Sequence, residues 1–190
     1  MPKVLVAGVG NVLRGDDGFG IEVVRRLLSQ GTPPGVEVME TGGGVGLVQK
    51  LLDGYDALIV VDAVQRGGAP GTVYLLEPQL PDTLPPPTDE LDALLGHLCD
   101  TQLSRLFILA KALGVLPPKV LVVGCQTQCC DELGSGLTEP VLEAVEVALE
   151  RVRAAINKLN GVRLLGTGAE GAEAVTSVRP NLQIKNERRR

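Results

Sequence analysis

Short apolar runs alternate with amphipathic segments along most of the chain. Runs that are rich in β-branched residues and bounded by glycine or polar residues are typical of buried strands. They predict strands over Val4–Val9, Val36–Met39, Ala57–Val64, Thr72–Leu76 and Lys119–Gly124, the fourth at a sheet edge. Between these strands, apolar residues recur at intervals of three and four, which is the spacing of one helix face.

This helical spacing predicts four helices. The first carries Ile21, Val24, Leu27 and Leu28, and the second covers Leu47–Leu52. The third runs from Leu91, or from shortly after His97, to Ala112. The last has Thr138 as its N-cap and a stripe of Leu142, Val145, Leu149, Val152 and Ile156.

Strands that alternate with helices predict the fold class α/β. We expect a three-layer α/β/α domain with a largely parallel twisted sheet of about five strands and helices on both faces. Residues 1–160 are expected to form this single domain. Beyond Gly161 the periodicity fades, which predicts a poorly ordered tail over residues 161–190.

Composition narrows the classes of function. No apolar run has the length of a membrane span and no signal peptide is visible, so we expect a cytoplasmic protein without membrane insertion. The net charge is −5, and six basic against three acidic residues from Gly161 to Arg190 give that segment +3 and leave −8 elsewhere. An acidic body with two Phe, two Tyr and no Trp argues against binding nucleic acid.

A glycine-rich loop with two aspartates follows the first strand. Gly8 and Gly10 are typical of a phosphate-binding turn, but Leu13 stands where a dinucleotide-binding loop needs its third glycine. Asp16 and Asp17 would also repel a pyrophosphate at the helix start. One aspartate is explained by helix capping, which leaves the other available as a ligand.

Asp62 and His97 are two further candidate ligands. Asp62 ends an apolar strand, where a carboxylate is either functional or a buried acceptor for a neighbouring loop. His97 is the only histidine and, taken alone, is an ordinary surface or core residue. Because ligands bind at the carboxyl ends of parallel strands, Asp17, Asp62 and His97 together predict a site for a borderline divalent metal such as Ni²⁺ or Zn²⁺.

The four cysteines, Cys99, Cys125, Cys129 and Cys130, do not form a recognisable metal motif. Their single Cys-x-x-x-Cys-Cys cluster does not repeat zinc-finger spacing, and one histidine excludes a Cys₂His₂ site. We expect reduced thiols.

Several stretches together resemble the hydrogenase maturation endopeptidases over roughly Lys3 to Ile156. They are "VLVAGVGNVLRGDDGFG", "ALIVVDAV" with the following "PGTV", His97 before a helix, "KVLVVG" and "GLTEPV". The start with Gly8, Gly10 and Asn11 followed by the acidic pair is the most specific of them. The acidic residue that the family often has before its second glycine cluster is Thr41 here, with Glu40 beside it.

The resemblance implies a processing protease. Such an enzyme removes a C-terminal extension from the large subunit of a nickel–iron hydrogenase after nickel insertion. It implies metal binding by Asp17, Asp62 and His97, with no permanent cofactor: the Ni²⁺ arrives with the nickel-loaded precursor, and Zn²⁺ or Cd²⁺ is expected to substitute in vitro.

The cleavage step and two rival functions stay open from the sequence. Peptide hydrolysis could use a metal-activated water, an Asp17–Asp62 acid/base pair of the aspartic type, or a Cys125–His97 nucleophilic dyad. One rival is a non-catalytic nickel-binding chaperone with the same ligands. The other is a peptidase of the same fold with a different substrate.

Overall fold

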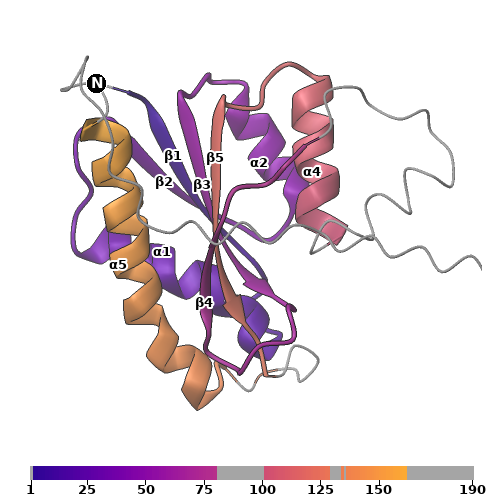
Figure 1. The fold of residues 1–190 in the computed structure, drawn as a ribbon, viewed down its shortest axis with the longest axis vertical. Coiled ribbons are helices and arrows are strands. Elements are labelled where there is room, and N and C mark those ends of the chain that lie inside the picture. The colour runs from indigo at the N-terminus through magenta and orange to yellow at the C-terminus, as the bar shows by residue number, and fades with distance from the viewer. Residues whose placement is uncertain (1, 81–100, 129–133, 135, 162–190) are drawn as a thin grey trace, which may run out of the picture.

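A five-stranded sheet forms the middle layer of the protein (Figure 1). The structure is a computed structural model that describes residues 2–80, 101–128, 134 and 136–161. The strands are β1 (Val4–Val9), β2 (Val36–Thr41), β3 (Ala57–Val64), β4 (Val73–Leu76) and β5 (Lys119–Gln126), in the spatial order β2-β1-β3-β5-β4. All neighbours are parallel except β4, which pairs antiparallel with β5 at the edge. The predicted α/β class with five strands is confirmed.

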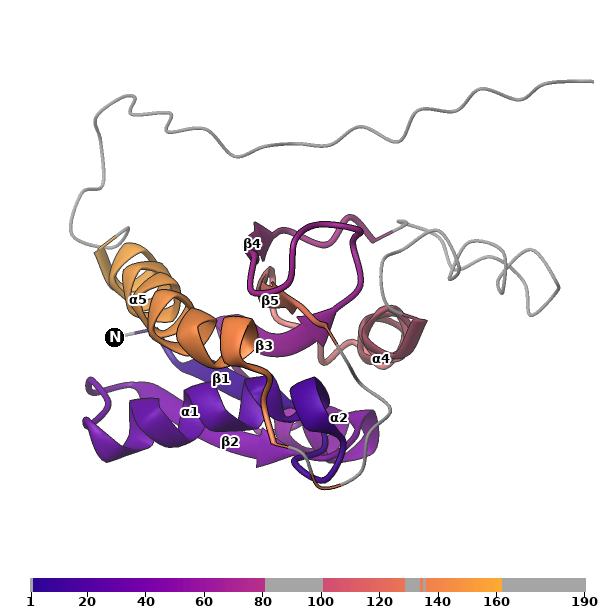
Figure 2. The same ribbon diagram turned by 90° about the horizontal axis from the view of Figure 1, so that it is seen from below.

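Helices cover both faces of this sheet. They are a short 3₁₀ helix η1 (Gly15–Gly18) and the α-helices α1 (Phe19–Ser29), α2 (Gly44–Leu51), α4 (Thr101–Ala112) and α5 (Glu139–Gly161). Seen from below, α1 and α5 lie on one face and α2 and α4 on the other (Figure 2). Of these described helices, none is sufficiently long and apolar to cross a membrane. The start predicted for the third helix and the predicted tail from residue 162 lie outside the described residues.

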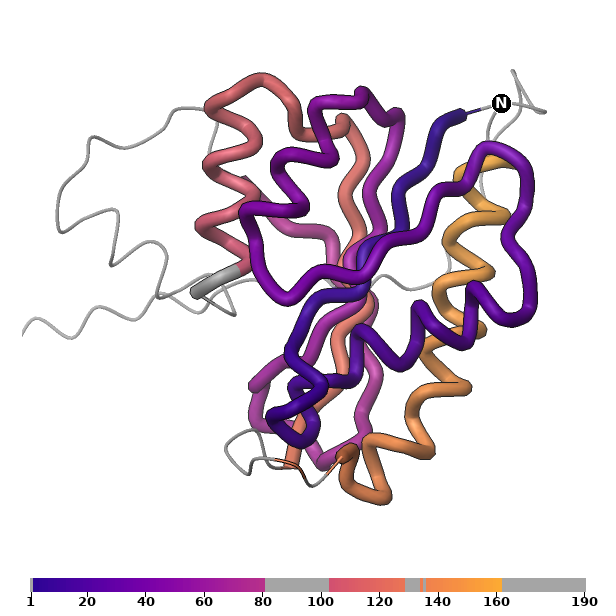
Figure 3. Tube along the Cα trace, turned by 180° about the vertical axis from the view of Figure 1, so that it is seen from behind, coloured from indigo at the N-terminus to yellow at the C-terminus, as the bar shows by residue number. Residues whose placement is uncertain are grey.

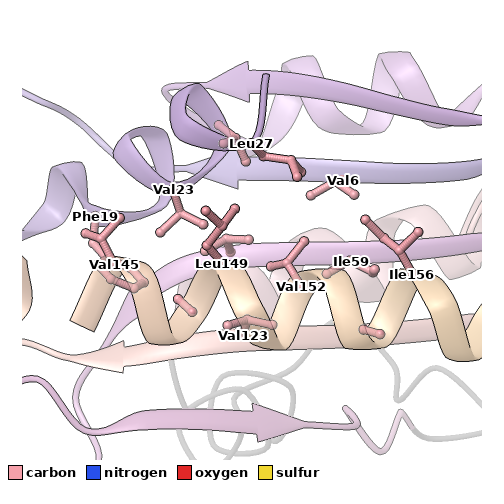
Figure 4. Packing of buried hydrophobic residues seen from close by; sticks show 14 of the residues in the cluster. Val6, Phe19, Val23, Leu27, Ile59, Val123, Val145, Leu149, Val152 and Ile156 are labelled. Atoms are coloured by element: carbon pink, nitrogen blue, oxygen red, sulfur yellow. The ribbon is translucent and has the colours of Figure 1, made fainter. Parts of the chain in front are cut away.

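Alternating strand residues divide the core between the two faces. Val6, Ile59 and Val123 pack against α1 and α5 (Figure 4), while Leu5 and Leu58 pack against α2 and α4. This follows from the two-residue period of a strand, which sends successive side chains to opposite faces. Because both faces are covered, the central strand β3 is buried over its whole length.

The prediction is wrong for two residues that were assigned to the apolar stripes of helices α1 and α5. Leu142 is 46% exposed and Leu28 is 47% exposed, whereas Val141 and Val23 are fully buried. On α5 the buried face also includes Ala144 and Ala148, so the face turned to the core is centred beside the predicted stripe. In α5, spacing alone favoured Leu142 over the neighbouring Val141.

Glycines bring the start of α1 onto the backbone of the sheet. A Cβ at Gly20 would overlap the carbonyl oxygens of Val9 and Val61, and one at Gly8 would overlap the carbonyl oxygen of Gly20. The view from behind shows this loop and α1 beside the strands (Figure 3). The close approach places η1 against β3, at the carboxyl ends of the parallel strands.

Candidate active site

Asp17 lies in η1 and is held by the loop that follows β1. The Asn11 N–H donates to Asp17 Oδ2 at 2.9 Å, and Asn11 Oδ1 accepts from the Leu13 N–H at 2.9 Å. Gly10 has φ +136°, and a Cβ there would overlap the carbonyl oxygen of Asp17, so only glycine fits. Within the described part of the chain, Asp17 Oδ1 takes no hydrogen bond. The loop therefore orients one oxygen and leaves the other available to a ligand.

Asp62 lies within β3, two residues before the strand ends at Val64. It pairs with Gly124 across the sheet, is 7% exposed, and its Oδ1 accepts from the Ala63 N–H at 2.8 Å. The strand period places it on the same face as Leu58 and Val60, toward α2 and α4. Asp62 and Asp17 therefore both belong to the carboxyl edge, on neighbouring elements.

The third predicted ligand, His97, lies outside the described residues. Among the residues that the structure does describe, no three His, Cys, Asp or Glu side chains gather as a metal site. The described geometry thus contains two carboxylates of the predicted three-ligand set.

Asp16 has a different role from the one expected for it. The sequence suggested that it serves the start of the helix that follows it. Instead, its fully buried carboxylate accepts hydrogen bonds from the Gln128 N–H at 2.8 Å and from the Thr138 N–H at 2.7 Å. The Thr138 hydroxyl donates to it as well, at 3.0 Å. Asp16 therefore joins the loop after β1 to the segment after β5 and to the start of α5.

Gln126 is a structural residue of the site that the sequence reasoning missed. This buried amide at the end of β5 accepts from the Arg66 N–H at 2.7 Å and the Gly68 N–H at 3.2 Å, and its Nε2 donates to Gln65 Oε1 at 2.8 Å. It thereby shapes the loop that follows Asp62 in the chain. An amide directly after a run of buried strand residues was the available signal.

The end of β2 supplies structural contacts. Glu40 pairs with Arg25, with 2.9 Å between Oε2 and Nη2. Thr41, 8% exposed, donates its hydroxyl hydrogen to the Gly43 carbonyl at 2.6 Å, and its own carbonyl accepts from the Gly10 N–H at 3.2 Å. The position that is often acidic in the family thus fixes the glycine turns after β1 and β2.

Cys125 is a core residue. Its side chain is fully buried on the sheet face toward α1 and α5, opposite to the face of Asp62. Burial raises the pKa of the Cys125 thiol to about 12, and the charge of Asp16 adds to this rise. Because the thiolate is the nucleophile, this burial and the raised pKa both argue against Cys125 as the nucleophile of the Cys125–His97 dyad.

Replacing Cys125 by alanine is therefore expected to leave processing activity within about twofold of the wild type. The reason is that the thiol is fully buried in the core, on the sheet face opposite to that of Asp62. Steady-state processing of a hydrogenase precursor, with a thermal melt to confirm folding, measures this. A folded Cys125→Ala protein without activity would contradict the assignment.

The fold and the described residues define a class of protein: a three-layer α/β protein with two aspartates, Asp17 and Asp62, at the carboxyl edge of its sheet. The family model described as hydrogenase maturation protease (HycI) matches residues 21–155. The chain belongs to this family, and its role is that of an endopeptidase in hydrogenase maturation.

Individual relatives agree with this assignment. The hydrogenase expression/formation protein HoxM of Azotobacter vinelandii is 34% identical over 154 residues, which are 78% of this chain and 69% of that protein. The structure of the hydrogenase maturating endopeptidase HybD from E. coli matches with a TM-score of 0.64 at 30% identity. The match covers 83% of this chain and 93% of the HybD chain. The structure of the hydrogenase 2 maturation peptidase from a Thaumarchaeota archaeon matches with a TM-score of 0.58 at 32% identity. This match covers 81% of this chain and 97% of the peptidase chain.

Proposed function

We propose that this endopeptidase removes the C-terminal extension of a nickel–iron hydrogenase large-subunit precursor after nickel insertion. Its recognition element is the nickel ion carried by the substrate, which Asp17, Asp62 and His97 bind. The observation that carries this proposal is Asp17, whose Oδ2 accepts the Asn11 N–H while Oδ1 takes no hydrogen bond from the described residues, in a 3₁₀ helix that contacts β3, the strand of Asp62. Two oxygen ligands and one imidazole suit a borderline divalent ion such as Ni²⁺.

The connectivity of α4 supports His97 as the third ligand. The end of α4 leads through residues 113–118 to the amino end of β5, so α4 begins toward the carboxyl edge, on the sheet face of Asp62. His97 precedes Thr101, the first described residue of α4, by four residues. In the sequence, His97 is thus separated from that end of α4 by only a short stretch of chain.

Metal-dependent recognition would make cleavage conditional on metal loading. In this scheme the protease holds no permanent metal, and a precursor without nickel offers no ion for the carboxylates to bind. The peptide bond beside the nickel is hydrolysed either by a water that the metal activates or by Asp17 and Asp62 as an acid/base pair. Both routes place the two carboxylates at the reacting centre.

The deciding experiment compares nickel-loaded and metal-free precursor with the same full-length protease. We expect shortening of the loaded precursor alone, followed on denaturing gels. Equal cleavage of both forms would overturn metal recognition. Tight nickel binding by the isolated chain without any shortening would support the chaperone instead, and cleavage of an unrelated protein alone would support a peptidase with another substrate.

A further inference from the structure

A second surface of the protein lies along the outer edge of β4, away from the carboxylates. A groove of about 1240 Å³ is formed there by β4, the start of β5, the end of α4 and the last turns of α5. Its walls come from both helical layers and its inner side from the edge strand. The groove thus continues the middle layer of the fold, where a further strand of the sheet would lie.

The backbone of β4 is arranged to accept such a strand. Tyr74 pairs with Gly124 and Leu76 with Val122, and the Gln126 N–H donates to the Thr72 carbonyl at 2.9 Å. Hydrogen-bonded pairs alternate along an antiparallel ladder, so the main-chain groups of Val73 and Leu75 face outward. Among the described residues, no strand pairs with this outer edge. Such an edge is a template for strand addition.

The groove is basic although the protein is acidic. Five basic residues and one acidic residue line it: Arg66, Lys111, Lys119, Arg151, Lys158 and Glu77. Their formal charge is +4, on a chain whose net charge is −5. Apolar side chains such as Val73 and Leu121 lie between the basic ones. An occupant with alternating apolar and acidic side chains matches this lining.

We propose that the β4 groove binds an extended acidic segment of the hydrogenase large-subunit precursor as an added strand, an inference that rests on the proposed function. The protein's own segment from Gly161 to Arg190 carries +3, which opposes a basic groove. Two copies of the chain joined through β4 would bring two basic linings together. An acidic segment of the substrate fits both the charge and the hydrogen-bonding edge.

The groove also has the right position for a second contact with the substrate. It begins at Arg66 and Val73, beside the carboxyl end of β5, and extends to Lys119 at the start of that strand. From Lys119 to Cys125 an extended chain spans roughly 20 Å, or about six residues. The precursor would thus contact the carboxyl edge through its nickel and the β4 groove through this segment.

Amide hydrogen exchange on the full-length chain tests the groove directly. The probe is a synthetic peptide of alternating valine and glutamate, with a valine–lysine peptide as its control. We expect the glutamate peptide alone to slow exchange at Val73 and Leu75. No slowing, or equal slowing by the lysine peptide, would overturn the proposal. Outward amides that are already protected in the chain without peptide would overturn it too, because the protein's own chain would then fill the groove.

Two variants on α5 test whether the hydrogenase precursor is what binds in the β4 groove. Arg151→Glu reverses a charge inside the groove, and Arg153→Glu makes the same change two residues away, outside it. With nickel-loaded precursor we expect Arg151→Glu to raise KM roughly fivefold at unchanged kcat, and Arg153→Glu to stay within about twofold. Equal KM values in both variants would overturn the precursor as the occupant. If the wild-type protein never shortens the precursor, the proposed function is overturned, and the precursor is then no longer supported as the occupant of the groove. The peptide experiment still tests whether the groove binds an acidic strand.

Discussion

Asp17→Asn and Asp62→Asn should each lower the rate of precursor processing by roughly 100-fold or more while the protein stays folded. Each substitution keeps the size of the side chain and removes its charge, which both candidate mechanisms require. The amide oxygen introduced by Asp17→Asn can still accept the Asn11 N–H hydrogen bond, so the loop after β1 is retained. Single-turnover processing of nickel-loaded precursor, with circular dichroism melts, measures both properties.

Asp53→Asn is the matched control for these two variants. Asp53 follows α2 at the amino edge of the sheet, where it bonds to Lys50 at 2.8 Å on the surface. The same change of charge there should leave processing within about twofold, because surface pairs contribute little. Wild-type activity in a folded Asp17→Asn protein would remove this residue from the reacting centre.

The sheet could be predicted because most strands are short runs of β-branched and other apolar residues bounded by glycine or polar residues. β3 has the predicted bounds, whereas β2 and β5 each extend two residues further, to Thr41 and Gln126. The last residue of each is polar, and apolar patterning therefore ends before the strand does. These two polar residues belong to the sheet because the pairing of the strands continues to them, with Thr41 opposite Val9 and Gln126 opposite Val64.

The candidate site could be predicted in part, for a related reason. Asp17 and Asp62 follow strand signals, and parallel strands bring their carboxyl ends to one edge. The partners of Asp16 could not be predicted, since Gln128 and Thr138 are 112 and 122 residues away in the chain. No local period encodes a contact of that separation. The signal for Gln126, an amide directly after a run of buried strand residues, was overlooked because the apolar run predicts the strand only as far as Gly124.

The two adjacent aspartates therefore differ in what their carboxylates contact. Asp17 is partly exposed and retains an oxygen without a hydrogen bond from the described residues, whereas Asp16 is fully buried and accepts hydrogen bonds from Gln128 and Thr138. The first arrangement suits a ligand or a catalytic group, and the second suits a fixed link between loops. Substituting each in turn should accordingly affect different properties.

Asp16→Ala is expected to lower the free energy of unfolding by about 3–5 kcal/mol, the largest loss of stability we predict. The substitution leaves the N–H groups of Gln128 and Thr138 without their acceptor, at about 1–3 kcal/mol each, and removes a bond from the Thr138 hydroxyl. For a chain of this size the melting temperature should fall by about 10 °C or more. Calorimetry or a circular dichroism melt measures the change.

Asp16→Asn and Asp17→Asn form the sharpest pair of variants, because the same change is made at adjacent positions. An amide in place of the Asp16 carboxylate turns a donor toward one of the main-chain N–H groups whose hydrogen bond it must accept, so stability should fall, while the protein that remains folded at low temperature still cleaves. Asp17→Asn should show the reverse, with wild-type stability and lost cleavage. If both variants lost activity equally at a temperature where both are folded, Asp16 would belong to the reacting centre and not only to the link between β1, β5 and α5.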